Sequence, residues 1–147
     1  MKIKHTIEIN SDIFVVFEYL ENIEKQKLWI KNLVKIEYHD PSQKKFNLYL
    51  KEGYKVKQYN GITKEVVKPY VLHVILYNKH FSSATIYKLE KNNGNTILYY
   101  EVKVQFNSII IKAVAFCFFL FSLAMVKKQL QKLKQVVEKA TNNADLG

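Results

Sequence analysis

The fold is decided by residues 109–126, which read IIIKAVAFCFFLFSLAMV. Only Lys112 and Ser122 interrupt this run with a strongly polar group. No glycine or proline separates it from the residues that follow, so the sequence predicts one continuous helix over about residues 108–140. A helix without a polar face must be covered on all sides by protein, by lipid or by a bound apolar molecule.

The second half of this predicted helix has an apolar stripe. The stripe residues follow one another at intervals of four, three, four and three, which is the spacing of one helix face. They are Val126, Leu130, Leu133, Val137 and Ala140. The lysines of this half lie off the stripe, so we expect the stripe to pack against the rest of the protein.

Three explanations fit the apolar run. It is a transmembrane helix, a core helix clasped by a curved sheet, or the same helix forming one wall of a ligand cavity. Its length is at the lower limit of the 17 to 25 or so residues that a bilayer requires. The sequence before residue 109 decides among the three.

That upstream sequence predicts one strand, two short helices and six further strands. Residues 2–9 alternate between apolar and polar side chains, as a half-buried strand does. Helical spacing follows over residues 13–20 behind the caps at 10–12, and a second short helix ends near Trp29. The segments with a period of two are then 33–39, 46–52, 54–68 (with a bulge expected at residues 60–61), 70–78, 81–90 and 96–106.

Short turns join these strands, the clearest being NNGN at residues 92–95, and they indicate an antiparallel meander. One face of such a sheet meets water, and the only large apolar element available to cover the other face is the helix from Ile109. We therefore predict an α+β fold, a seven-stranded curved antiparallel sheet around a long C-terminal helix, rather than a membrane-spanning chain. Residues 1–147 are expected to form a single domain with a frayed tail at 141–147.

The charge limits the classes of partner. The net charge is +10, and all 23 basic residues are lysines. Arginine is the preferred bidentate reader of guanine and phosphate, so we expect no specific nucleic-acid recognition and only weak attraction to an anionic membrane surface. The single Cys117 excludes a disulfide, and residues 1–9 lack the apolar region of a signal peptide. These features predict a cytoplasmic protein, with a membrane-peripheral location left open.

Several motifs together resemble one superfamily. The opening IEINSD at residues 7–12, VFEYL at 16–20 and then Trp29 resembles the start of the START-like, or Bet v 1-like, superfamily (SRPBCC), which includes polyketide cyclases, dehydrases and lipid-transfer proteins. KPYVL at 68–72 and YKLE at 87–90 are similar to further motifs of that group, whose Gly-Thr hairpin is interrupted here by Asn95. The resemblance covers about the whole chain. It implies a helix-grip fold with a deep apolar cavity between sheet and helix for lipids, sterols, polyketides or other hydrophobic ligands.

A cavity of that kind would be lined by the inward faces of the strands and by the helix. Apolar walls with a few polar groups suit a small-molecule site. The expected ligand-binding residues are Trp29, Tyr54, Val56, Gln58, Leu72, Val74, Thr85, Tyr87, Tyr100, Val102, Phe116, Phe119 and Leu123. The same large side chains also fit a filled core.

The sequence contains no recognisable catalytic or metal motif. His5 lies on the apolar face of the first strand, where a hydrogen-bonded structural role is expected, and the four histidines have no metal-ligand spacing. We expect no metal and no cofactor. The favoured function is non-enzymatic binding or transport of a hydrophobic small molecule or lipid. The alternatives are a cyclase- or dehydrase-like enzyme using Tyr, His and Gln as acid–base groups, and an interaction module that applies the aromatic helix to a membrane or a partner chain.

Overall fold

The computed structural model describes residues 1–42, 44–107 and 109–146, with the side chains of 109–121 left out. The elements follow the predicted order of one strand, two short helices, six strands and a long helix. They are β1 (Lys2–Ile9), α1 (Ile13–Glu21), α2 (Ile23–Gln26), β2 (Leu33–Tyr38), β3 (Lys45–Glu52), β4 (Lys55–Val67), β5 (Val71–Tyr77), β6 (Phe81–Asn92), β7 (Asn95–Phe106) and α3 (Ile109–Leu146).

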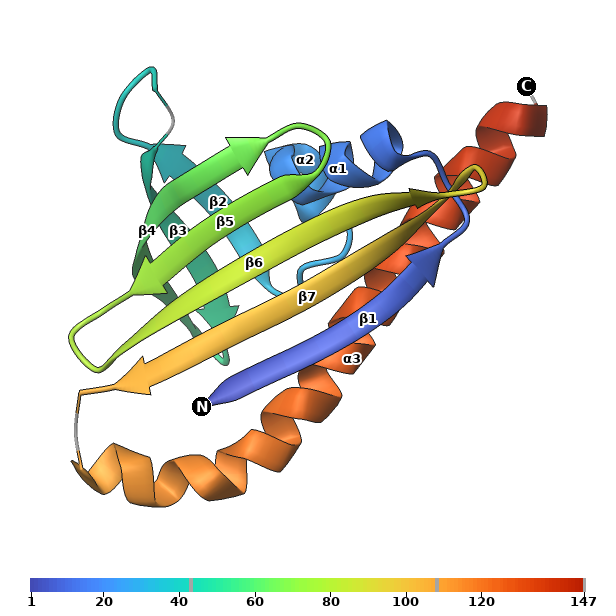
Figure 1. Cartoon of the computed structure of the whole chain (residues 1–147). Coiled ribbons are helices and arrows are strands. Elements are labelled where there is room, and N and C mark those ends of the chain that lie inside the picture. Colours follow the sequence, from blue (N-terminus) through green and yellow to red (C-terminus); the bar gives the residue numbers. More distant parts are fainter. Residues whose placement is uncertain (43, 108, 147) are drawn as a thin grey trace.

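Over the described residues, the strands form one seven-stranded antiparallel sheet in the order β1-β7-β6-β5-β4-β3-β2. Strands β2 to β7 form a meander, and β1 is added beside β7. The sheet is curved, and α1, α2 and the second half of α3 lie on the same side of it (Figure 1). The predicted helix-grip arrangement is therefore confirmed.

Local sequence signals explain where the elements begin and end. The carboxylate of Asp12 accepts a hydrogen bond from the backbone N–H of Phe14 (2.9 Å) and caps α1, and Asn22 caps α2 in the same way through Lys25 N–H (3.1 Å). In the β6–β7 hairpin both central residues, Asn93 and Gly94, have positive φ (51° and 87°). This is the type I′ geometry that matches the twist of two paired strands.

The apolar stripe of α3 forms the centre of the core, as predicted. Leu130, Leu133 and Val137 are almost completely buried, and Val126 and Ala140 pack at the border of the same cluster. Burial of each such side chain contributes about 1.5–3 kcal/mol. The partners come from β1, α1, the α2–β2 connection, β5, β6 and β7: Ile7, Ile9, Ile13, Val16, Phe17, Tyr19, Leu20, Trp29, Leu72, Leu89 and Leu98.

The C-terminal helix is longer than predicted. It continues to Leu146, through the segment at 141–147 that we expected to fray, because no glycine or proline stops it before Gly147. Among the side chains that the structure describes, no helix combines the length and apolar character needed to cross a bilayer.

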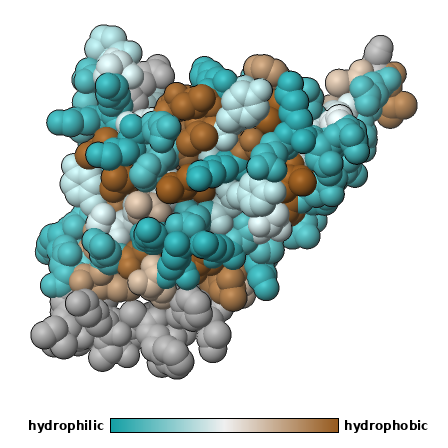
Figure 2. All heavy atoms as spheres, viewed as in Figure 1, coloured by the Kyte–Doolittle hydropathy of each residue, from teal (hydrophilic) through white to brown (hydrophobic). Residues whose placement is uncertain are grey.

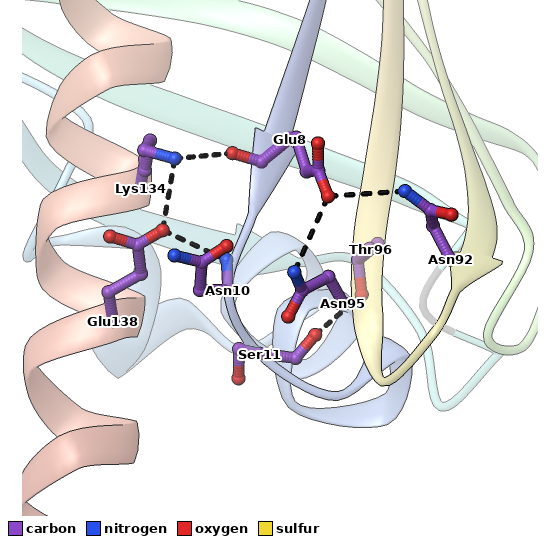
Figure 3. A network of polar contacts seen from close by, with 8 residues as sticks. All are labelled: Glu8, Asn10, Ser11, Asn92, Asn95, Thr96, Lys134 and Glu138. Carbon is purple, nitrogen blue, oxygen red and sulfur yellow. Dashed lines mark hydrogen bonds and ion pairs between the residues drawn. The ribbon is translucent and has the colours of Figure 1, made fainter.

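A set of polar contacts fixes the second half of α3 to the start of the chain (Figure 3). Lys134 Nζ donates to the carbonyl of Glu8 (2.6 Å) and pairs with Glu138 (3.0 Å), whose carboxylate accepts from Asn10 N–H (2.9 Å). We call this set the polar clasp. It consists of Glu8, Asn10, Ser11, Thr96, Lys134, Glu138 and Thr141.

The buried part of the clasp is Ser11 with its two threonine partners. Thr96 Oγ1 donates to the Ser11 carbonyl (2.8 Å), and the hydroxyls of Ser11 and Thr141 are 2.6 Å apart. Thr96 is fully buried and Ser11 is nearly so, so water does not replace a lost partner. The clasp therefore sets the register of α3 against the β1–α1 turn, which the apolar stripe alone leaves free to slide.

We expect Thr96→Val to lower the free energy of unfolding by about 1–3 kcal/mol, because it leaves the buried Ser11 carbonyl without its donor. Urea unfolding followed by circular dichroism measures this. The control Thr6→Val replaces an exposed threonine of β1 and is expected to change stability by less than about 0.5 kcal/mol. Equal effects of the two variants would contradict a structural role for the Thr96 hydroxyl.

A second close contact fixes the β3–β4 pair. Gly61 is the register partner of Phe46, and a Cβ at Gly61 would lie 2.2 Å from the Phe46 ring. Gly61→Ala is expected to lower stability by about 1–3 kcal/mol through this overlap. Adding Phe46→Leu, which shortens the side chain, is expected to recover part of that loss in the same unfolding assay. If the double variant is no more stable than Gly61→Ala alone, the overlap is not the cause.

Candidate functional site

The candidate site is on the side of the sheet that faces α1 and α3, which we call the inner face. Strand register defines it: Leu98, Tyr100 and Val102 of β7 are paired with Leu89, Tyr87 and Thr85 of β6. Leu98 and Leu89 belong to the core beneath α3. The inner face is therefore continuous from the core to residues further along the same strands.

Beyond the core, the inner face is only half-buried. The residues concerned lie on the three strands β5, β6 and β7. We call them the inner wall: Val74, Leu76, Ser83, Thr85, Tyr87, Tyr100, Val102 and Val104. Of these, only Val102 is fully buried, whereas the equivalent positions beneath α1 and the second half of α3 are closed. The inner wall is thus the part of the face with accessible surface for another molecule.

Two tyrosines, a threonine and a serine supply the polar groups of the inner wall. The rings of Tyr87 and Tyr100 meet edge to face with centroids 5.4 Å apart. Burial raises the pKa of both hydroxyls, with a smaller contribution from Tyr100 at Tyr87, and a hydrogen bond with Thr85 partly offsets the rise in the pKa of Tyr100. Both hydroxyls therefore stay protonated at neutral pH and act as neutral hydrogen-bonding groups.

Among the described side chains, the register neighbours of the inner wall contribute no carboxylate or ammonium group. Register adds Ile3 and His5 of β1 and Gly61 and Thr63 of β4. His5 lies opposite Tyr100 and is half-buried. Within the described side chains, no group of three or more His, Cys, Asp and Glu residues is arranged to hold a metal ion.

The expected site residues fall into separate groups in the structure. Val74, Thr85, Tyr87, Tyr100 and Val102 come together on the inner wall. Trp29 and Leu72 instead belong to the core. The Trp29 indole donates to the carbonyl of Tyr19 (2.8 Å), which fixes α1 to the segment after α2.

Tyr54, Val56 and Gln58 do not lie on the inner face, and this corrects the sequence-based assignment. The sheet has its irregularity between Thr63 and Glu65, not at residues 60–61. Gly61 and Tyr59 are paired with the buried Phe46 and Leu48 of β3, so they point to the inner side and Gln58 and Val56 point to the outer side. All three predicted residues are exposed, and Tyr54 is completely so, in the β3–β4 turn.

The helix side of the predicted site is described only in part. Leu123 is half-buried and lies three residues before Val126, on the same stripe. The side chains of Phe116 and Phe119 lie outside the described residues.

Sequence reasoning missed Leu76, Ser83 and Val104 of the inner wall. Each is the cross-strand partner of another: Ser83 is paired with both Leu76 and Val104. The signal was the alternation of β6, since Ser83 has the same parity as Thr85 and Tyr87. Extending that parity by one residue pair would have found Ser83.

A shallow hollow of about 230 Å³ lies along β1, β7 and β6. Most of its lining comes from alternate residues that point away from α3: Lys4, Thr6, Ile86, Lys88, Tyr99 and Glu101, with His5 and Tyr100. The visible face of the sheet shows such polar groups around apolar islands (Figure 2). This charged, open hollow suits an apolar ligand less well than the inner wall does.

Comparison with known structures agrees with the topology. A conserved protein from Geobacillus kaustophilus superposes with a TM-score of 0.76 at 13% identity, covering 95% of this chain and 97% of the other. A START superfamily protein from Mycobacterium smegmatis gives 0.70 at 12% identity (95% and 98% covered), and Ara h 8.0201 gives 0.69 at 12% (97% and 98%). No family model and no curated protein matches the sequence. The chain has the START-like, or Bet v 1-like, fold.

The raised pKa of the inner-wall tyrosines predicts a dependence of stability on alkaline pH. The folded pKa of Tyr87 is raised, so its contribution is complete below the unfolded value of about 10 and is lost as pH rises above it. The loss approaches about 1.4 kcal/mol per pH unit for one proton. Between about pH 9 and 11, the free energy of unfolding measured with urea should fall less steeply with pH for Tyr87→Phe than for wild type. Tyr54→Phe, at a fully exposed site, is the matched control and should keep the wild-type slope.

Proposed function

We propose that the protein binds a hydrophobic small molecule or lipid between the inner wall and α3, and that it acts as a carrier rather than as an enzyme. The observation that carries this proposal is the half-buried inner wall, where apolar side chains surround a few hydroxyl groups. A concave apolar surface with a few polar groups is the usual form of a small-molecule site. The fold that the chain shares with a solved START superfamily protein supports the binding of a hydrophobic molecule.

The polar groups indicate the kind of ligand. Because Tyr87 and Tyr100 are held protonated, their hydroxyls favour an uncharged acceptor such as a carbonyl or hydroxyl oxygen. Among the described side chains, the wall and its register neighbours offer no ammonium group to neutralise a buried carboxylate, whose burial without a partner is costly. We therefore propose a largely apolar ligand with one neutral polar group near Thr85.

The proposed binding set keeps the residues that the structure leaves on the inner side. They are Val74, Thr85, Tyr87, Tyr100, Val102 and Leu123, with Phe116 and Phe119 retained from the sequence prediction. Trp29 and Leu72 support them from the core. We also propose that residues 1–147 act as one START-like domain.

The enzymatic alternative is supported less well. Proton transfer at neutral pH requires a group whose pKa is near 7, and burial moves the pKa of Tyr87 and Tyr100 away from that value. Among the described residues, the inner wall and its register neighbours include no carboxylate. His5 is the one conventional acid–base group beside the wall in this described part. A cyclase- or dehydrase-like reaction would have to use it.

A second proposal concerns location. The net charge of +10 attracts the protein weakly to anionic surfaces, and a carrier of apolar molecules has to meet the membranes that hold them. We propose a cytoplasmic protein in transient, peripheral contact with anionic membranes. No specific binding to nucleic acid is proposed, since the chain has no arginine.

Adjacent serines of β6 provide a matched test of ligand binding. Ser83 faces the inner wall, whereas Ser82 is paired with Gln105 and Tyr77 on the other face. Ser83→Phe adds a ring where the ligand would lie, so Nile red, a neutral apolar dye, should bind at least about tenfold more weakly. Ser82→Phe makes the same substitution on the opposite face and should bind the dye within about twofold of wild type.

Native mass spectrometry of freshly purified protein is the companion measurement. An apolar molecule bound to wild type and to Ser82→Phe but absent from Ser83→Phe supports the proposal. If Nile red binds both variants equally, or binds neither variant nor wild type, the inner wall is not a ligand site. Urea unfolding of both variants identifies any loss of binding that comes from loss of the fold.

A further inference from the structure

One end of the sheet gathers exposed lysines around a fully exposed tyrosine. Register defines this end. The β3–β4 turn lies between the paired residues Glu52 and Lys55, and the β5–β6 turn follows Tyr77, which is paired with Asn60 of β4. The first residues of β4 therefore extend past the end of β5, and both turns lie at the same ends of the strands. Both turns lie on the lower side of the view, as does the N-terminus (Figure 1). We call this the basic end.

Tyr54 is the outermost side chain of the basic end. Its relative exposure is 106%, so its ring makes almost no contact with the rest of the protein. Gly53, with φ of 62°, permits the tight two-residue turn that presents it. Val56, next on the same side of the hairpin, is 55% exposed. An aromatic ring and a valine held this far into water have no structural role in the isolated chain.

The surrounding charges are mainly positive. The β3–β4 hairpin carries Lys51, Lys55 and Lys57, and the β5–β6 turn carries Lys79. Glu52 is the acidic residue of the same hairpin, and it is already bonded to Lys57 (2.6 Å). Among the described residues, Lys51, Lys55 and Lys79 form no ion pair with a carboxylate.

We propose that the basic end docks on the surface of a bilayer containing anionic phospholipid, with Tyr54 in the interfacial region and Lys51, Lys55 and Lys79 against the headgroups. Tyrosine is enriched at membrane interfaces, where its ring contacts the acyl boundary and its hydroxyl stays wet. Each lysine near an anionic surface adds roughly a fivefold gain in partitioning. The lysines complement the negative headgroups of such a bilayer, and the Tyr54 ring complements the apolar layer beneath them.

This inference rests on the proposed carrier function and adds the partner from which the ligand comes. The inner wall runs toward the same end, since Ser83, Leu76 and Val104 lie close to the β5–β6 turn and the end of β7. Docking by the basic end therefore brings the accessible part of the inner face toward the lipid. The opposite end is closed by the core and the polar clasp.

The β3–β4 hairpin offers a matched pair of variants for the test. Lys51→Glu with Lys55→Glu reverses two charges beside the turn at the basic end, and Lys44→Glu with Lys45→Glu reverses two exposed charges where β3 begins, at the other end of the hairpin. Both double variants change the net charge equally. Co-sedimentation is measured with vesicles of phosphatidylcholine alone and of phosphatidylcholine mixed with phosphatidylglycerol.

Wild type is expected to bind the mixed vesicles, to release them as salt rises, and to bind phosphatidylcholine weakly. The basic-end variant should bind the mixed vesicles at least about tenfold more weakly, and the control variant within about threefold of wild type. Equal losses in the two variants, or no binding by wild type, would overturn the proposal.

Tyr54→Trp reports the position of the tip. Its fluorescence should shift to shorter wavelength on the mixed vesicles and be quenched by lipids brominated near the headgroup, whereas Tyr70→Trp, at a partly exposed position in the β4–β5 turn at the opposite edge, should not respond. Tight binding of an RNA oligomer with no response of Tyr54→Trp to vesicles would favour a nucleic-acid partner and overturn the membrane assignment.

Nile red binding in the absence of vesicles separates the two proposals. The basic-end variant should bind the dye like wild type if the inner wall is the ligand site. If wild type docks on vesicles but binds no apolar ligand, the membrane surface stands and the carrier function fails.

Discussion

The structure depends on the mutual burial of the α3 stripe and the inner face of β1 and β7. Leu130, Leu133 and Val137 share one buried cluster with Ile9 and Leu98, which would face water without them, and α1 completes that cluster. Two isolated elements of this kind gain little, because conformational entropy opposes ordering each one and only their contact removes apolar area from water. The polar clasp determines how α3 is aligned along the sheet. It selects one helix register among those that the stripe alone allows, since Thr96, Ser11 and Thr141 meet in only one alignment.

The same contact divides the inner face into two regions with different consequences. Where α1 and the second half of α3 cover the sheet, side chains interlock and exposure falls to nearly zero. Further along β5, β6 and β7 the inner wall is half-buried, and its hydroxyls have no dense packing to join. A protein that needed only stability would place large apolar residues at Ser83 and Thr85. The small polar residues there leave surface free at the cost of core area, which is the compromise expected of a binding site.

Much of the fold follows from sequence periodicity, and the exceptions have a common cause. The stripe of α3, the caps at Asp12 and Asn22 and the Asn93–Gly94 turn were all readable, because each depends on neighbours within a few positions. Which side chains of β4 face inward could not be predicted in this way. Their direction depends on the pairing of β4 with β3 and on the Phe46 ring that occupies the space above Gly61, a contact across strands. The register of β4 with β3 places Tyr54, Val56 and Gln58 on the exterior instead of in the expected cavity, while Val74, Thr85, Tyr87, Tyr100 and Val102 face inward as expected.

The correction changes what those three residues mean. A tyrosine inside a cavity would contact the ligand. Tyr54 instead lies exposed at the tip of a lysine-rich hairpin, where it is available to bind a partner. The arrangement also separates the charges from the neutral interior. Among the described residues, no lysine belongs to the inner wall, and the wall beyond the core holds tyrosine hydroxyls whose raised pKa keeps them uncharged. An apolar molecule that moves between a membrane and this wall would meet no charged group among the described side chains of the wall itself. The positive exterior would hold the protein near the lipid surface during that transfer, because the attraction acts over about 8–10 Å and needs no specific contact.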